Sequence, residues 1–245
     1  MIIVNIFLDI FSYLWHNEKA RKQGSKEARK QGSKEARKQG SKEARKQGSK
    51  EARKQGGNYM DTAKIETAIR MLLEGIGEDP LRPGLLDTPK RVAKMYEDIL
   101  SGMGVDASQE VLPFLPDEYD EMVIAKDITF YSICEHHLIP FFGKAHIAYI
   151  PNKGRMIGLS KLSQIVDIFS KRLQVQERLV SEIADTLMET LKPQGVLVVI
   201  DAQHLCMTMR GVKKPGSSII ASAVRGIFQN AATRAEALSL IRGDK

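Results

Sequence analysis

The strongest constraint on the fold is a run of five tandem copies of an eight-residue unit that fills residues 18–57. The first copy reads Glu18-Lys-Ala-Arg-Lys-Gln-Gly-Ser25. The copies contain no aromatic or large aliphatic side chain, so they bury too little apolar area to offset the entropy lost on ordering. The sequence therefore predicts a disordered or partly helical tail at residues 1–59 and one folded domain at residues 60–245.

The repeat also accounts for the basic character of the chain. Each copy has three basic residues and one acidic residue, so the five copies contribute +10, whereas the whole 245-residue chain carries +7. Residues 1–17 contribute only the −1 of Asp9, which leaves −2 on residues 58–245. A mildly acidic domain gives little reason to expect specific nucleic-acid binding.

Two interpretations of residues 1–59 stay open. The segment is either a functionless expansion or extension upstream of a true start at Met60, or a weak electrostatic tether for RNA or an anionic membrane.

Residues 2–15 are apolar, but they fall short of the roughly 20 residues that span a bilayer. No basic residue precedes them and no small-residue cleavage site follows them, which argues against a secretory signal. We expect no membrane span and, with only two cysteines, a reducing cytoplasmic setting.

Apolar periodicity predicts an α+β domain in which helices pack on an antiparallel sheet. Ile65, Ala68, Ile69 and Leu72 are expected to form the buried face of the first helix. Helices are expected at residues 63–73, from 88, from 158, 176–191 and 232–241, and strands at 121–133, 145–150, 196–200, 207–212 and 219–228. We also expect Thr88 to cap the second helix and Phe142-Gly143 to form a turn.

Both cysteines and three of the five histidines lie in two short segments. The pair Cys134-x-x-His137 has the spacing of a zinc clamp, and Cys206 would add a third ligand. Three protein ligands leave one tetrahedral position open for a catalytic water. His136 and His204 would then remain for proton transfer near neutral pH. From these residues alone, a catalytic metal, a structural metal with a fourth ligand and no metal at all stay open.

Several polar residues have two interpretations each. Arg91 and Lys94 share one helix face near its N-terminal end, which attracts anions but is also typical of a solvated basic face. Glu177, after Gln176 at the start of another helix, either complements the helix dipole or binds a purine or pterin edge. Arg210 belongs either to a solvated basic hairpin or to a polyphosphate clamp.

Six motifs, in order along residues 60–242, resemble the GTP cyclohydrolase I family of zinc enzymes. They are Asp87-Thr-Pro-Lys-Arg-Val-Ala-Lys-Met-Tyr96, Ser132-Ile-Cys-Glu-His-His137, Gly143-Lys-Ala-His-Ile-Ala-Tyr-Ile-Pro151, Ile157-Gly-Leu-Ser-Lys-Leu162, Gln174-Val-Gln-Glu-Arg-Leu179 and His204-Leu-Cys-Met-Thr-Met-Arg-Gly-Val212. The resemblance implies a T-fold, a toroidal homodecamer with sites between subunits, and GTP as substrate. It also implies opening of the guanine ring at C8, loss of formate and rearrangement to 7,8-dihydroneopterin triphosphate, the first step of folate and pterin biosynthesis.

The resemblance also assigns residues. It implies a Zn²⁺ ion on Cys134, His137 and Cys206, with His136 and His204 transferring protons. The substrate residues that it implies are Gln176 and Glu177 for guanine and Arg91, Lys94, Ser160, Lys161 and Arg210 for the triphosphate or ribose. One position departs from the family, since Gln164 stands where an arginine often holds the triphosphate. That difference implies weaker GTP binding.

Overall fold

A computed structural model of the chain describes residues 60–110, 113–114 and 119–243. The predictions for residues 1–59 therefore lie outside the described residues. Among the helices that are described, none combines the length and the apolar character needed to cross a membrane.

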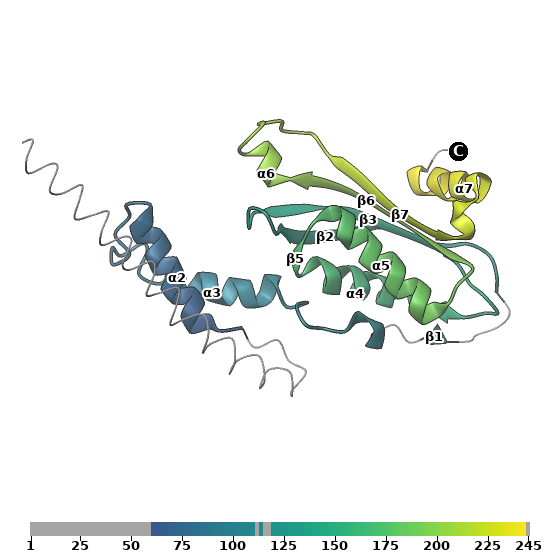
Figure 1. Cartoon of the computed structure of the whole chain (residues 1–245), viewed down its shortest axis with the longest axis horizontal. Coiled ribbons are helices and arrows are strands. Elements are labelled where there is room, and N and C mark those ends of the chain that lie inside the picture. The colour runs from purple at the N-terminus through teal and green to yellow at the C-terminus, as the bar shows by residue number, and fades with distance from the viewer. Residues whose placement is uncertain (1–59, 111–112, 115–118, 244–245) are drawn as a thin grey trace, which may run out of the picture. The chain divides into compact units, whose positions relative to one another are not determined.

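A five-stranded sheet in the order β5-β2-β3-β6-β7 forms the centre of the domain (Figure 1). Its four longer strands pair antiparallel, and the two-residue β5 pairs parallel with β2. The strands are β2 (Val123–Cys134), β3 (Pro140–Ile150), β5 (Leu173–Gln174), β6 (Gly195–His204) and β7 (Ile219–Gly226). The predicted α+β class with an antiparallel sheet is confirmed.

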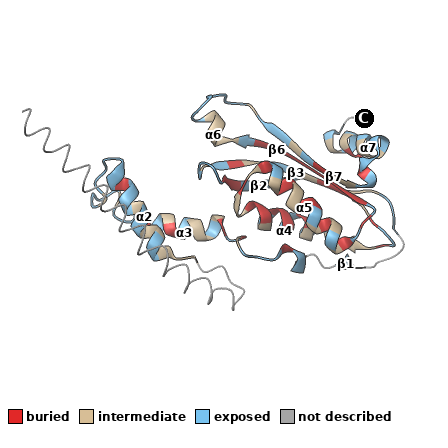
Figure 2. Cartoon of the chain, viewed as in Figure 1, coloured by how far each residue is buried: buried red, intermediate tan, exposed pale blue. Residues whose placement is uncertain are grey.

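Two helices, α4 (Leu159–Ser170) and α5 (Gln176–Leu191), cover one face of this sheet (Figures 1 and 2). The predicted limits of α5 are confirmed at both ends, because its apolar residues recur every four positions and meet the sheet. Those residues, Leu179, Ile183, Leu187 and Leu191, are all completely buried. The helix α7 (Ala231–Arg242) packs on a second, smaller core that contains Ala148, Leu197 and Phe228.

The remaining elements are short or lie before the sheet. They are α2 (Thr62–Gly75), α3 (Thr88–Ile99), α6 (Leu205–Thr208), the 3₁₀ turns η2 (Ala107–Gln109) and η3 (Ile227–Gln229), and the strand pair β1 (Pro113–Phe114) and β4 (Met156–Ile157). The predicted helix at residues 63–73 is confirmed as α2, but its predicted buried face is wrong. Only Leu73 of α2 is buried, and Leu72 is 56% exposed. The helix packs mainly against α3, so most of its apolar surface stays open.

Three local predictions are also wrong. Phe142 and Gly143 lie inside β3, not in a turn, and β6 passes so close that a Cβ on Gly143 would lie 1.9 Å from the carbonyl oxygen of Asp201. The glycine thus permits close strand pairing. Residues 207–212 form the end of α6 and a turn, not a strand. The N-cap of α3 is Asp87, one residue before the expected Thr88.

Candidate active site

A tight turn after β2 brings Cys134 and His137 together. The backbone N–H groups of His137 and Leu138 both donate to the carbonyl of Cys134, at 3.3 and 2.8 Å. Leu138 takes a left-handed conformation, with φ of 54°, and Ile139 accepts the N–H of Cys134 at 3.0 Å. These bonds close the turn and place the Cys134 Sγ 3.8 Å from the His137 Nδ1.

The third ligand reaches this turn through strand pairing. β6 pairs with β3 up to His204, which lies opposite Phe141, and the chain then enters α6 with Cys206 as its second residue. One ligand atom from each of Cys134, His137 and Cys206 lies within 4.8 Å of the others. Two segments about 70 residues apart therefore meet at one point, as the sequence predicted.

The donor set and its spacing fit a zinc ion. Zn–S bonds of about 2.3 Å and Zn–N bonds of about 2.0–2.1 Å place tetrahedral ligand atoms roughly 3.5–3.8 Å apart, so small side-chain movements suffice. Both cysteines are free thiols. Burial raises the pKa of the Cys206 thiol, and the neighbouring Cys134 raises it further. Two thiolates at this distance repel each other, and a bound cation removes that cost.

His204 lies beside the cluster in a fixed orientation. Its ring stacks on Phe141 with centroids 4.7 Å apart and planes 2° apart, and its Nε2 lies 2.8 Å from the Gln176 Oε1. Burial lowers the pKa of His204, while the charge of Glu177 opposes that shift. The imidazole is therefore held in place and favoured in its neutral form.

His136 has a different environment. Its side chain is 65% exposed, and its Nε2 lies 3.9 Å from the Glu135 carboxylate. Glu135 in turn accepts a hydrogen bond from Arg178, which lowers the pKa of that carboxyl. Arg178 also donates to Gln174 and to the Leu173 carbonyl. It therefore connects α5 to the turn that carries Cys134 and His137, which we call the metal turn. Sequence reasoning missed this arginine, because nothing in the pattern of a helical arginine indicates a partner 43 residues away.

The two residues predicted to bind guanine differ in exposure. Glu177 is exposed, whereas Gln176 is only 1% exposed. The Gln176 amide nitrogen donates to the carbonyls of Ile200 and Ile219, and its oxygen faces His204. The Gln176 amide therefore has three partners inside the chain.

The predicted triphosphate residues are not gathered as the metal ligands are. Lys161, in the first turn of α4 beside the exposed Ser160, pairs with Glu110 at 3.1 Å, and Gln164 is exposed one turn later. Arg210 follows α6, and its positive charge acts to lower the pKa of the Cys206 thiol, against the larger effect of burial.

Arg91 and Lys94 lie on α3, more than 70% exposed. They form ion pairs with the N-cap residue Asp87 and with Glu97 of the same helix, respectively, both at 3.2 Å. Among the described residues, neither these two side chains nor Lys161 forms a hydrogen bond or ion pair with Cys134, His137 or Cys206.

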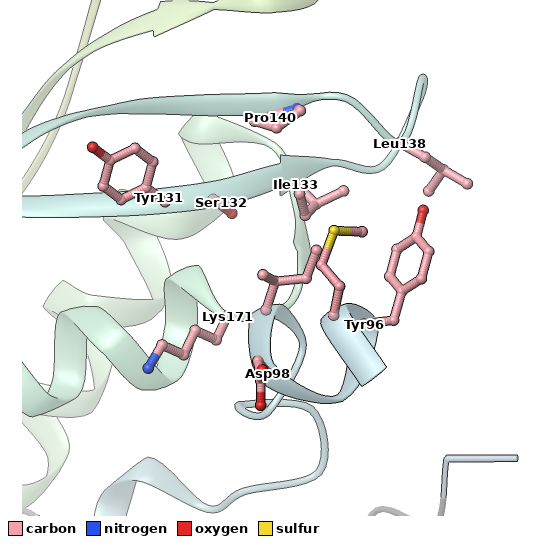
Figure 3. Close-up of a pocket in the computed structure, with 10 residues that line it drawn as sticks. Tyr96, Asp98, Tyr131, Ser132, Ile133, Leu138, Pro140 and Lys171 are labelled. Atoms are coloured by element: carbon pink, nitrogen blue, oxygen red, sulfur yellow. The ribbon is translucent and has the colours of Figure 1, made fainter. Parts of the chain in front are cut away.

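A mostly apolar cavity of about 480 Å³ lies between α3 and the β2–β3 hairpin (Figure 3). Ile133 and Leu138, which flank the metal turn, form part of its wall together with Tyr96 of α3. The hydroxyl of Ser132 is buried there without a hydrogen-bond partner among the described residues. Sequence reasoning missed this cavity, because its walls come from elements that are distant in the chain.

Comparison with known proteins gives a consistent result. A family model described as GTP cyclohydrolase I matches residues 65–242. A protein named GTP cyclohydrolase 1 from Carboxydothermus hydrogenoformans is 62% identical over 183 residues, which cover 74% of this chain and 95% of the relative. A protein of the same name from Pelotomaculum thermopropionicum is 61% identical over 184 residues, 75% of this chain and 98% of the relative. A crystal structure of an archaeosine synthase QueF-Like shows a weaker likeness, with a TM-score of 0.36 and 18% identity over 43% of this chain and 93% of that chain.

Proposed function

The chain belongs to the GTP cyclohydrolase I family of enzymes, and from that premise we propose a zinc-dependent reaction on GTP. In this reaction the guanine ring is opened at C8, formate leaves, and rearrangement gives 7,8-dihydroneopterin triphosphate. The observation that carries the proposal is the group of Cys134, His137 and Cys206, which a single chain brings together. A tetrahedral ion held by these three residues would have one position left for water. We assign the reaction to the start of folate and pterin biosynthesis, in the cytoplasm.

The three proposed metal ligands come from three different places in the chain. Cys134 is buried at the end of β2, and His137 and Cys206 approach from the turn and from α6. When bound, zinc supplies Lewis-acid activation of water near neutral pH. The protein fixes the ligand geometry through the closed turn and the β3–β6 register, which also keeps Phe141 and His204 beside the cluster.

His204 and His136 are suited to different proton transfers. His204 is half-buried, and burial lowers its pKa and so favours the neutral ring, which suits it to take a proton from a reacting group and return it, a role worth about 10²–10⁴-fold in rate. His136 is exposed beside Glu135, so it is suited to exchange protons with solvent or with a substrate that enters from that side. The exposed carboxylate of Glu177 is free to accept two N–H bonds from the guanine edge.

We further propose that the chain forms a T-fold homo-oligomer, a toroidal decamer with sites between subunits. Large apolar side chains on and near α2 and α3 are exposed in the single chain, which supports burial against a neighbour. They are Met71, Leu72, Ile76, Leu81, Leu86 and Met95. In this arrangement Arg91 and Lys94 bind the triphosphate at a site whose metal ligands come from another subunit, together with Ser160, Lys161 and Arg210.

The test is to incubate zinc-loaded protein with GTP and to measure formate and a fluorescent pterin after oxidation. We expect both products in equal amounts with GTP and neither with ATP, which lacks the guanine edge that Glu177 would bind. If the protein carries stoichiometric zinc and GTP yields no product, the proposal is overturned, even if GTP binds.

A further inference from the structure

We propose that Gln176 is a positioning residue for His204 and not a contact to guanine. It holds the imidazole as the tautomer with hydrogen on Nε2 and a bare Nδ1. This inference rests on the proposed function in one respect, the use of His204 for proton transfer.

The orientation of the Gln176 amide is decided by its neighbours. Its Nε2 lies 2.9 Å from the carbonyl oxygen of Ile200 and 2.8 Å from that of Ile219. Carbonyl oxygens only accept hydrogen bonds, so the NH₂ group must face both of them. An amide turned by 180° would place its own oxygen against two carbonyl oxygens. The chain therefore fixes which end of the amide faces His204.

The tautomer of His204 follows from that orientation. The Gln176 Oε1 lies 2.8 Å from the His204 Nε2, and an amide oxygen only accepts. The His204 Nε2 must therefore carry a hydrogen. A neutral imidazole has a single N–H, so Nδ1 keeps its lone pair.

A second contact fixes the plane of the same ring. Phe141 lies directly opposite His204 in the β3–β6 register and stacks on it at 4.7 Å. Phe141 thus sets the tilt of the imidazole, and Gln176 sets its rotation within that plane. Because Cys206 follows two residues later, the same strand end presents a metal ligand and an oriented imidazole.

The burial of Gln176 separates it from the substrate side. It is the first residue of α5, and it joins β6 and β7 where their ladder ends, at Ala202 and Ile219. To bind guanine, its side chain would have to give up three hydrogen bonds inside the protein. Glu177, the next residue, is exposed and bears no such cost.

The experiment compares three variants of the zinc-loaded full chain. Gln176→Met keeps the side-chain length and removes every hydrogen bond, and we expect kcat to fall about 10- to 100-fold, with KM for GTP and zinc content unchanged. Glu177→Gln serves as the substrate-contact comparison, and we expect it to raise KM about tenfold or more. Gln176→Glu should recover much of the kcat lost in Gln176→Met. A protonated carboxyl at this position accepts from the His204 Nε2–H as the amide does, and it donates to one of the two carbonyls that the amide binds.

A double variant tests whether Gln176 acts through His204. In a His204→Ala background, adding Gln176→Met should cause no further loss of activity. A raised KM with intact kcat in Gln176→Met would show a substrate contact and overturn the proposal. So would a Gln176→Glu variant no more active than Gln176→Met, which would indicate a purely structural role.

The tautomer can be measured without any turnover. Solid-state ¹⁵N spectra of histidine-labelled protein, with the His204 signals assigned by their loss in His204→Ala, should show hydrogen on Nε2 and a bare Nδ1. Hydrogen on Nδ1 instead would overturn the proposal. If GTP gives no product but Nε2 carries the hydrogen, the proposed function fails while the positioning by Gln176 stands.

Discussion

The metal-and-histidine half of the site and its triphosphate half differ in how far a single chain completes them. The first half is assembled by sheet pairing, since the β2 turn and the end of β6 bring Cys134, His137 and Cys206 within 4.8 Å of one another. The proposed second half includes Arg91 and Lys94, which lie exposed on α3 and, within the described part of the chain, form ion pairs with Asp87 and Glu97.

The difference follows from what fixes each group in space. Strand register places side chains to within one residue, because a slip would move every buried residue of β6 to the wrong face. α2 and α3 have no comparable support in the single chain, where much of their apolar surface is exposed. We infer that the chemistry belongs to one subunit and that part of the substrate binding is supplied by its neighbour.

The largest expected effect is the loss of a metal ligand. Cys206→Ser should abolish stoichiometric zinc and lower formate release by about 10³-fold or more, because only two of the three ligands remain. Zinc content and formate are measured on the same sample. Met209→Leu, in the exposed turn after α6, is the matched control and should keep both. Full zinc occupancy in Cys206→Ser would remove Cys206 from the metal half.

The next effect separates chemistry from metal binding. His204→Ala should keep its zinc and lose about 10²–10⁴-fold in kcat, because it removes the proton-transfer group without touching a ligand. His146→Ala is a suitable control, since His146 accepts the Asp127 N–H on another part of the sheet. Loss of zinc in His204→Ala with recovery of activity at high zinc would mean that His204 is a ligand.

The triphosphate half should respond in KM and not in kcat. Arg91→Ala removes one charge-assisted contact, worth about 1.5–3 kcal/mol, so KM for GTP should rise about 10- to 100-fold with kcat nearly unchanged. Lys90→Ala removes a neighbouring exposed charge on the same helix and should change neither constant. Equal effects of the two variants on KM would reduce the role of Arg91 to general electrostatic attraction.

The smallest effect tests the departure at Gln164. Gln164→Arg should lower KM for GTP by up to about tenfold with little change in kcat, because it restores a positive charge one turn from Lys161. Ser163→Arg places the same charge on the adjacent exposed position and serves as control. An unchanged or higher KM in Gln164→Arg would remove this position from the triphosphate half.

The sequence predicted the elements whose periodicity matches their burial. The limits of α5 agreed with its four-residue leucine and isoleucine repeat, and the metal group agreed with ligand spacing and the scarcity of cysteine. The start of β3 was missed because Phe142-Gly143 resembles a turn, whereas the glycine makes room for β6. The inward orientation of Gln176 could not be predicted either, since its acceptors lie 24 and 43 residues away.

Complementation between a chain that lacks a metal ligand and a chain with weakened GTP binding tests the division of the site most directly. Chains carrying Cys206→Ser and chains carrying both Arg91→Ala and Lys94→Ala are coexpressed with different affinity tags, and hybrids are isolated by two purifications. If neighbouring subunits share each site, the hybrid regains formate release with a KM for GTP near that of the unaltered protein. A hybrid that keeps the raised KM of its Arg91→Ala, Lys94→Ala parent would contradict the account and place all of these residues in one chain's site.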